Sequence, residues 1–127
     1  MAFERDRPEI PDDYGVPETP EGTLEWAAVE ERLSRALHYW MATTRPDGRP
    51  HVVPRWGVWW DGRFWYDGSP TTVHVRNLDR NSACVLHLED GRRAVMVEGT
   101  SVAADPPGLE TGGRLAAEFG RKYADLG

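Results

Sequence analysis

Cysteine is almost absent from the 127-residue sequence, and the single Cys84 excludes a disulfide within the chain. Because disulfides are rare in proteins of reducing compartments, a chain that cannot form one is expected in the cytoplasm. Cys84 lies in an apolar run, which favours a buried, inert thiol over a nucleophile. No hydrophobic run approaches the length of a membrane span, and no apolar signal region opens the chain, so we expect no contact with a membrane.

Basic residues are also scarce, because 15 of them face 21 acidic residues and leave a net charge of −6. This balance argues against a nucleic-acid partner, which normally meets an excess of basic residues. The four histidines stand apart from one another, and no His or Cys pair has metal-ligand spacing, so no metal site is predicted. Nucleotide-binding loops and a serine nucleophile elbow are missing too.

The length predicts one folded domain preceded by an arm. Residues 1–22 carry four prolines among acidic residues and no apolar periodicity, which predicts an extended N-terminal arm. The domain is expected over residues 23–127. Thr23 is the expected N-cap of a helix over Leu24–Leu37. Its apolar stripe has helical spacing and consists of Trp26, Val29, Leu33 and Leu37.

Aromatic residues are abundant, with six tryptophans, and they concentrate in the stretch Tyr39–Tyr66. Two Asp-Gly turn signals divide this stretch into three runs of strand-forming residues, which predicts a three-stranded antiparallel meander. Pro54 and Gly57 are weak points of its second strand, where an edge or a bulge is expected. Neither face of that strand is polar throughout, so we expect both faces to be covered.

The next segment predicts a short helix that begins with Ser69 as the cap and Pro70 in the first turn. Its free N–H groups, the hydroxyls of Ser69, Thr71 and Thr72, and the nearby His74 and Arg76 together suit an anion. An ordinary strand-to-helix connection is the alternative.

Two further strands and a helix complete the prediction. The strands are expected at Ala83–Glu89 and Arg93–Ala103, with a bulge at Gly99, and the helix at Leu109–Tyr123. Short strands with tight turns and flanking helices predict a mainly β protein with a closed or split β-barrel.

Three blocks carry a family resemblance, and in chain order they are YWMATTRPDGRPHVVPRWGVWWDGRFWY, SPTTVHVRNL and VLHLEDGRRAVMVEGT. Together they resemble the pyridoxamine 5'-phosphate oxidase-like split-barrel family, especially its actinobacterial branch, which uses FMN or the deazaflavin coenzyme F-420. The resemblance covers Leu24–Tyr123. It implies a homodimer with two flavin sites in the subunit interface.

The resemblance also implies a cofactor site. The second strand would run beside the isoalloxazine ring, and the block T-x-x-x-S-x-K-x-x-N-L would hold the phosphate. In that block Thr72 stands at the serine and His74 at the lysine. The implied cofactor-binding residues are Val53, Pro54, Arg55, Trp56, Ser69, Thr72, His74, Arg76 and Asn77.

Several departures from the family pattern weaken this block. The family threonine falls on Gly68, Val73 occupies a place where some members have arginine, and His74 is a weaker cation with an ordinary pKa of about 6.5. Arg55 or Arg76 would compensate. Relatives continue past the last helix into another strand, and that C-terminal strand is expected to be missing here because the sequence ends at Gly127.

The function implied is a flavin-dependent oxidoreductase that moves hydride to or from a small organic substrate. No catalytic residue is predicted; His51 and Tyr66 are candidates for substrate contact, with structural roles as the alternative. Two other functions stay open: a non-catalytic flavin- or haem-binding split barrel, and a degenerate dimeric interaction module. F-420 has a longer acidic tail than FMN, so cations outside the pocket would favour F-420.

Overall fold

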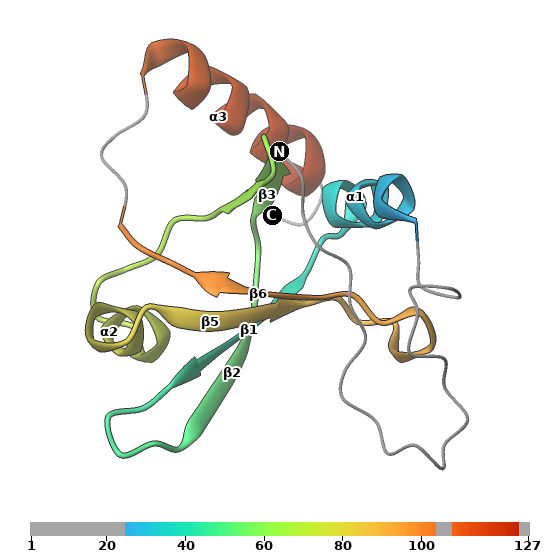
Figure 1. The fold of residues 1–127 in the computed structure, drawn as a ribbon. Helices are drawn as coiled ribbons and strands as arrows, with labels where there is room; N and C mark the ends of the chain where they lie inside the picture. The colour runs from blue at the N-terminus through green and yellow to red at the C-terminus, as the bar shows by residue number, and fades with distance from the viewer. Residues whose placement is uncertain (1–24, 104–107, 125–127) are drawn as a thin grey trace.

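The computed structural model describes residues 25–103 and 108–124, so the predicted arm and the predicted cap Thr23 lie outside the described residues. Three α-helices and six strands form the fold (Figure 1). The helices are α1 (Trp26–Arg35), α2 (Val73–Arg80) and α3 (Leu109–Tyr123), with a 3-10 turn, η2, at Gly91–Arg93. The strands are β1 (Tyr39–Thr44), β2 (Pro50–Arg55), β3 (Val58–Trp60), β4 (Arg63–Trp65), β5 (Ala83–His87) and β6 (Met96–Thr100).

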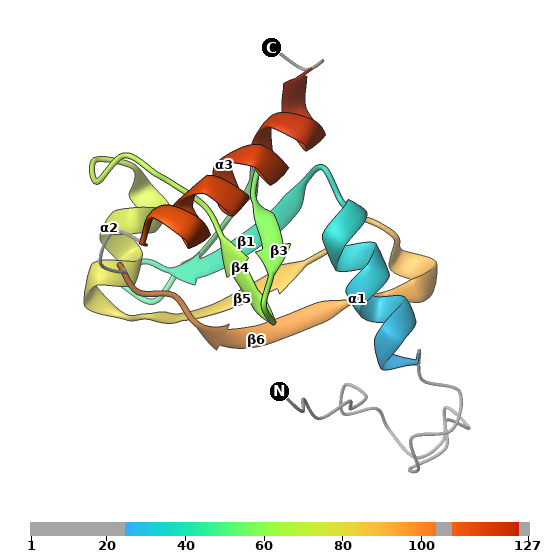
Figure 2. The same ribbon diagram turned by 90° about the horizontal axis from the view of Figure 1, so that it is seen from above.

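Four strands form an antiparallel sheet in the order β2-β1-β5-β6, and β3 pairs only with β4 in a second sheet. Figure 2 shows β3 and β4 lying across the main sheet, with α3 over β3 and α1 at one end. The predicted three-stranded meander is therefore wrong, since its second strand is divided between the two sheets. The helices hold slightly more residues than the strands, so the fold is mixed rather than mainly β.

The division between the sheets falls at Trp56 and Gly57, one of the two predicted weak points. A Cβ atom on Gly57 would lie 2.2 Å from the Phe64 ring and 2.8 Å from the carbonyl oxygen of Trp65. Only glycine permits Phe64 and Trp65 of β4 to pack this closely on the backbone at the break between the sheets. Pro54 lies on edge strand β2, as predicted, where its missing N–H costs no ladder bond.

The hydrophobic core lies between α1 and the main sheet and continues to α2 and Trp59. Tyr39 is fully buried and donates its hydroxyl hydrogen to the carbonyl of Leu33, which ties α1 to β1. Leu86 of β5 and Leu88 and Val95, between β5 and β6, are buried in this core. Leu37 does not join the stripe of α1, because the helix ends at Arg35 and the Leu37 side chain is 41% exposed.

Two other local predictions are wrong. α2 begins at Val73 with Thr72 as its N-cap, because the Ser69 carbonyl accepts hydrogen bonds from the Thr72 N–H (3.1 Å) and hydroxyl (2.9 Å). These bonds close a turn before the helix. Gly99 pairs with Cys84 in an uninterrupted β5–β6 register, so it forms no bulge. The bounds of α3 are those predicted.

None of the helices in the described part of the chain has the length and apolar character needed to cross a membrane.

Replacing Gly57 tests the break between the sheets. We expect Gly57→Ala to lower the free energy of unfolding by about 1–3 kcal/mol, because the new methyl group overlaps the Phe64 ring and a backbone oxygen. Gly99→Ala is the matched control, since its Cβ would meet no atom within 4 Å. Urea unfolding of both variants measures the difference; equal stability of the two would contradict this account.

Candidate functional site

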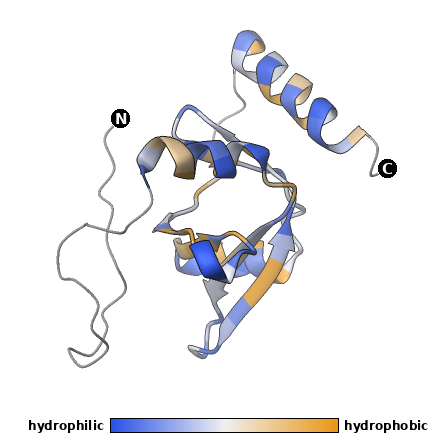
Figure 3. Cartoon of the chain, turned by 90° about the vertical axis from the view of Figure 1, so that its right-hand side faces the viewer, coloured by the Kyte–Doolittle hydropathy of each residue, from blue (hydrophilic) through white to orange (hydrophobic). Residues whose placement is uncertain are grey.

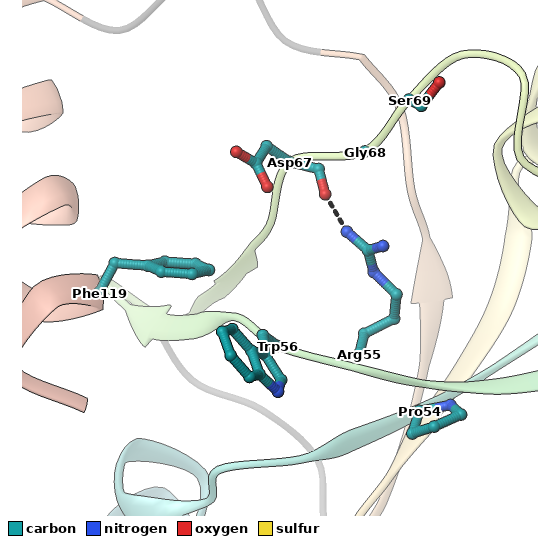
Figure 4. Close-up of a pocket in the computed structure, with 7 residues that line it drawn as sticks. All are labelled: Pro54, Arg55, Trp56, Asp67, Gly68, Ser69 and Phe119. Atoms are coloured by element: carbon teal, nitrogen blue, oxygen red, sulfur yellow. Dashed lines mark hydrogen bonds between the residues drawn. The ribbon is translucent and has the colours of Figure 1, made fainter. Parts of the chain in front are cut away.

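A pocket of about 460 Å³ opens where the end of β2, the β4–α2 connection and α3 meet (Figure 4). Its lining residues come from all three segments and are Pro54, Arg55, Trp56, Asp67, Gly68, Ser69 and Phe119. The Arg55 guanidinium donates a hydrogen bond to the carbonyl oxygen of Asp67, as Figure 4 shows. This bond joins β2 to the connection before α2 and places a permanent positive charge in the pocket wall.

Arg55 is further positioned by Tyr66. The guanidinium carbon lies 5.0 Å from the centre of the Tyr66 ring, a cation–π contact. The Tyr66 hydroxyl is in turn hydrogen-bonded to the Ser101 hydroxyl at 2.6 Å. Tyr66, a predicted candidate for substrate contact, therefore packs against Arg55 and helps to position its guanidinium.

Buried nitrogen atoms without a hydrogen-bond partner gather beside Arg55. Within the described residues they include His51 Nδ1, Arg55 Nε and His74 Nε2, while Trp59 Nε1 is a further one in the core. A buried polar group without a hydrogen-bond partner costs about 1–3 kcal/mol of folding free energy. Several such groups in one place therefore indicate a site where a ligand supplies the missing partners. His51 and Arg55 lie on the same face of β2, because they are separated by an even number of residues.

His74 lies on the first turn of α2, and its side chain is only 5% exposed. Burial, followed by the charges of Arg55 and His51, lowers the pKa of His74 below its ordinary value. The lowered pKa favours the neutral form of the imidazole. A Cβ on Gly68 would lie 3.5 Å from Arg55 Nη2 and 3.9 Å from His74 Nε2, so the two side chains flank the same glycine.

The nine predicted cofactor-binding residues separate into two groups. Pro54, Arg55, Trp56 and Ser69 line the pocket, and His74 adjoins it at Gly68. Val53 shares the half-buried face of β2 with Arg55, and Thr72 is bonded into the turn that follows Ser69. The remaining two, Arg76 and Asn77, line a different pocket described below.

Sequence reasoning missed Asp67 and Phe119 as lining residues. Phe119 reaches the pocket from α3, fifty or more residues away in sequence from the other lining residues, and no local pattern relates it to them. The Asp67 carbonyl carries no sequence signal, because every residue has one.

The end of α3 is fixed by two polar side chains that reach the break at Gly57. Lys122 donates hydrogen bonds from Nζ to the Tyr39 hydroxyl and to the Gly57 carbonyl, both at 2.8 Å. The Tyr123 hydroxyl accepts the Gly57 N–H at 3.0 Å and lies 2.7 Å from the carbonyl oxygen of Leu37. Trp56 stacks on the Tyr123 ring at 4.5 Å, so this anchoring also sets one wall of the pocket.

A second pocket, of about 350 Å³, lies between the β1–β2 turn and the exposed face of α2. Four arginines line it together with one acidic residue, and the full lining is Arg45, Pro46, Asp47, Arg49, Val73, Arg76, Asn77 and Arg80. The Asn77 side chain is buried and donates from Nδ2 to the Thr43 hydroxyl at 3.0 Å. Asn77 therefore joins α2 to β1, a structural role.

The antiparallel sheet with a crossing hairpin is shared with known split-barrel structures. Rv2991, a conserved hypothetical protein from Mycobacterium tuberculosis, is 24% identical with a TM-score of 0.68, and the match covers 80% of this chain and 65% of that one. An F-420 reductase is 26% identical over 84% of this chain and 79% of that one, with a TM-score of 0.59. The haem storage protein HutZ from Vibrio cholerae is 17% identical over 80% and 77%, with a TM-score of 0.62.

Residues 26–125 match the family model described as pyridoxamine 5'-phosphate oxidase. The chain belongs to this family and has its split-barrel fold, which confirms the resemblance found in the sequence. It spans 65% of the length of the mycobacterial protein. No curated protein matches the chain significantly in sequence.

The anchoring of α3 predicts a distinctive dependence of stability on pH. Burial lowers the pKa of Lys122 from 10.5 to about 8, so the unfolded chain binds the proton more tightly than the native protein. The contribution of Lys122 to stability is thus fully present above pH 10.5 and is lost as the pH falls through about 8. Between pH 7 and 9.5 the wild-type protein should gain stability relative to Lys122→Met.

Urea unfolding at several pH values in this range measures that gain. The comparison with Lys122→Met cancels the contributions of titrating groups that Lys122 does not contact. Tyr39 and Tyr123, which do contact Lys122, stay protonated over this range because burial raises their pKa values. Parallel pH profiles for the two proteins would show that Lys122 keeps an ordinary pKa.

Proposed function

We propose that the pocket beside Arg55 binds the phosphate end of FMN or F-420 and that the protein is a flavin-dependent oxidoreductase. The observation that carries the proposal is the set of buried, unpartnered nitrogens of His51, Arg55 and His74. Arg55 supplies a full charge and His74 a hydrogen-bonding nitrogen, and both side chains flank Gly68 in the pocket wall. These groups fit a phosphate, which accepts several hydrogen bonds and prefers arginine.

In this proposal Arg55 and His74 take over the role of the family lysine. Binding of a phosphate beside His74 raises the pKa of the imidazole, because a nearby anion favours its charged form. Complex formation then takes up a proton, and the imidazolium donates to the phosphate. His51, previously a candidate for substrate contact, becomes a further phosphate-binding residue.

When bound, the cofactor supplies hydride chemistry at its ring. The residues of this chain bind and orient it and exclude water from one side. Val53, Pro54 and Trp56 would lie along the ring, since they extend β2 from the phosphate end toward the break at Gly57. No side chain near the pocket is assigned as a general acid or base, and the substrate is expected to be a small organic molecule that receives or gives the hydride.

A second copy of the chain would complete the site. The pocket is lined in part by residues at the end of β2, which is an edge strand of the main sheet. Its outward side chains include Val52, 52% exposed, and Trp56 is 36% exposed at its end. Apolar residues on an unpaired edge favour association, so we propose a homodimer in which each partner covers the cofactor site of the other.

Haem binding is the competing function, because an unpartnered imidazole nitrogen such as His74 Nε2 is also the atom that ligates haem iron. A non-catalytic flavin carrier would use the same pocket. The absorption spectrum of the bound chromophore distinguishes haem from flavin. Turnover of a bound flavin distinguishes an enzyme from a carrier.

Titration of the purified protein with FMN, F-420 and haem tests the proposal. We expect micromolar or tighter binding of FMN or F-420, and a weakening of at least tenfold in the double variant Arg55→Ala/His74→Ala. Loss of one charge-assisted hydrogen bond costs about 1.5–3 kcal/mol, which corresponds to this effect. The variant His74→Lys, which restores the family residue, should bind at least as tightly as the wild type at pH 8.

The matched control is Arg63→Ala/His38→Ala, which removes an exposed arginine and an exposed histidine elsewhere. Circular dichroism checks that both double variants are folded. Bleaching of the flavin absorbance by a reductant and its return with an acceptor would support catalysis. Failure of both FMN and F-420 to bind below 100 µM, which is about 5.5 kcal/mol of binding free energy, would contradict the proposal.

A further inference from the structure

The second pocket gathers positive charge in a protein whose net charge is −6. Arg45 and Arg49 come from the two sides of the β1–β2 turn, and Arg76 and Arg80 from α2. Asp47 is the one carboxylate among the lining residues, and it lies 2.7 Å from Arg49 in an ion pair. Within the part of the chain that the structure describes, the other three arginines have no ion pair.

The turn places two of these charges directly opposite each other. The Arg45 N–H donates to the Arg49 carbonyl at 2.9 Å, which continues the β1–β2 ladder by one pair beyond Thr44 and Pro50. Gly48 closes the turn with φ of +88°, a backbone conformation that other residues rarely adopt. Like charges at opposite positions of a strand pair are unfavourable.

The helix repeats the same arrangement. Arg76 and Arg80 are four residues apart on α2, so their side chains lie on one face, where like charges destabilise the helix by about 0.2–0.5 kcal/mol. Both arginine pairs border the same pocket. Asp47 offsets part of the charge at the turn, but one carboxylate does not balance four arginines, and the excess positive charge would be relieved by a bound anion.

The walls of this pocket are fixed independently of any ligand. Asn77 lies between Arg76 and Arg80 in sequence and is bonded to Thr43 near the end of β1. Thr43 and Asn77 are both buried. The hairpin and the helix therefore keep their separation, and the four arginines converge on a volume of about 350 Å³.

We propose that this second pocket binds a small ligand with two or more phosphate or carboxylate groups. Arginine forks match both groups, and three unpaired arginines suit more than one anionic group. The volume fits a small molecule, and the negative charge of the whole chain opposes a nucleic acid. Binding of a free polyanion here is independent of the proposed flavin site, whereas binding of a cofactor tail rests on that proposed function. Its ligand is either a free polyanion or the acidic tail of F-420 bound next to His74.

Isothermal titration calorimetry with pyrophosphate and with citrate tests the proposal at low ionic strength. We expect at least one of them to bind with a Kd below 1 mM and to bind at least tenfold more weakly to Arg76→Gln/Arg80→Gln. The control Arg63→Gln/Arg92→Gln removes two exposed arginines elsewhere and should change the Kd less than twofold. Binding weaker than 10 mM, or an equal loss in both variants, would overturn the proposal.

The same variant distinguishes the two sources of the anion. If it weakens binding of F-420 but leaves FMN binding unchanged, the pocket holds the cofactor tail. If it abolishes pyrophosphate or citrate binding and leaves both cofactors unchanged, the pocket serves a free ligand. A single-stranded oligonucleotide that binds through these arginines more tightly than pyrophosphate would contradict a small-molecule site.

Discussion

The close approach of Phe64 to Gly57 is the constraint on which the rest of the arrangement depends. A side chain at position 57 would occupy the space of the Phe64 ring, so the break after β2 requires glycine. The same break exposes the N–H and carbonyl of Gly57 to Tyr123 and Lys122, which anchor α3 there. Because Trp56 stacks on Tyr123, the break also sets the pocket wall opposite Arg55.

The two pockets would favour an anion for different physical reasons. Beside Gly68, one nitrogen each of Arg55, His51 and His74 is buried without a hydrogen-bond partner, so an anion gains hydrogen bonds that the free protein lacks. Beside α2, three exposed arginines and the half-buried Arg45 gather around one carboxylate, Asp47, so an anion gains mainly from neutralising charge. α2 borders both, with His74 toward the first pocket and Arg76 and Arg80 lining the second.

Sequence patterns predicted the features that depend on interactions between residues close together in the sequence. The bounds of α3 and the edge position of Pro54 follow from spacing and from residue type. The separation of β2 from β3 could not be predicted, because it depends on Phe64 packing against Gly57 across the β3–β4 hairpin. Phe119 in the pocket and the meeting of two arginine pairs likewise depend on tertiary contacts between distant segments.

We propose that the buried imidazole nitrogens of His51 and His74 are the partners of a bound phosphate. Nitrogen-15 NMR of the histidine rings, with and without saturating FMN or F-420, measures this directly. The account predicts that the ring nitrogens of His51 and His74 shift toward the values of a protonated, hydrogen-bonded imidazole, while those of His38 and His87 stay unchanged. A cofactor that binds without moving the resonances of His51 or His74 would contradict the claim.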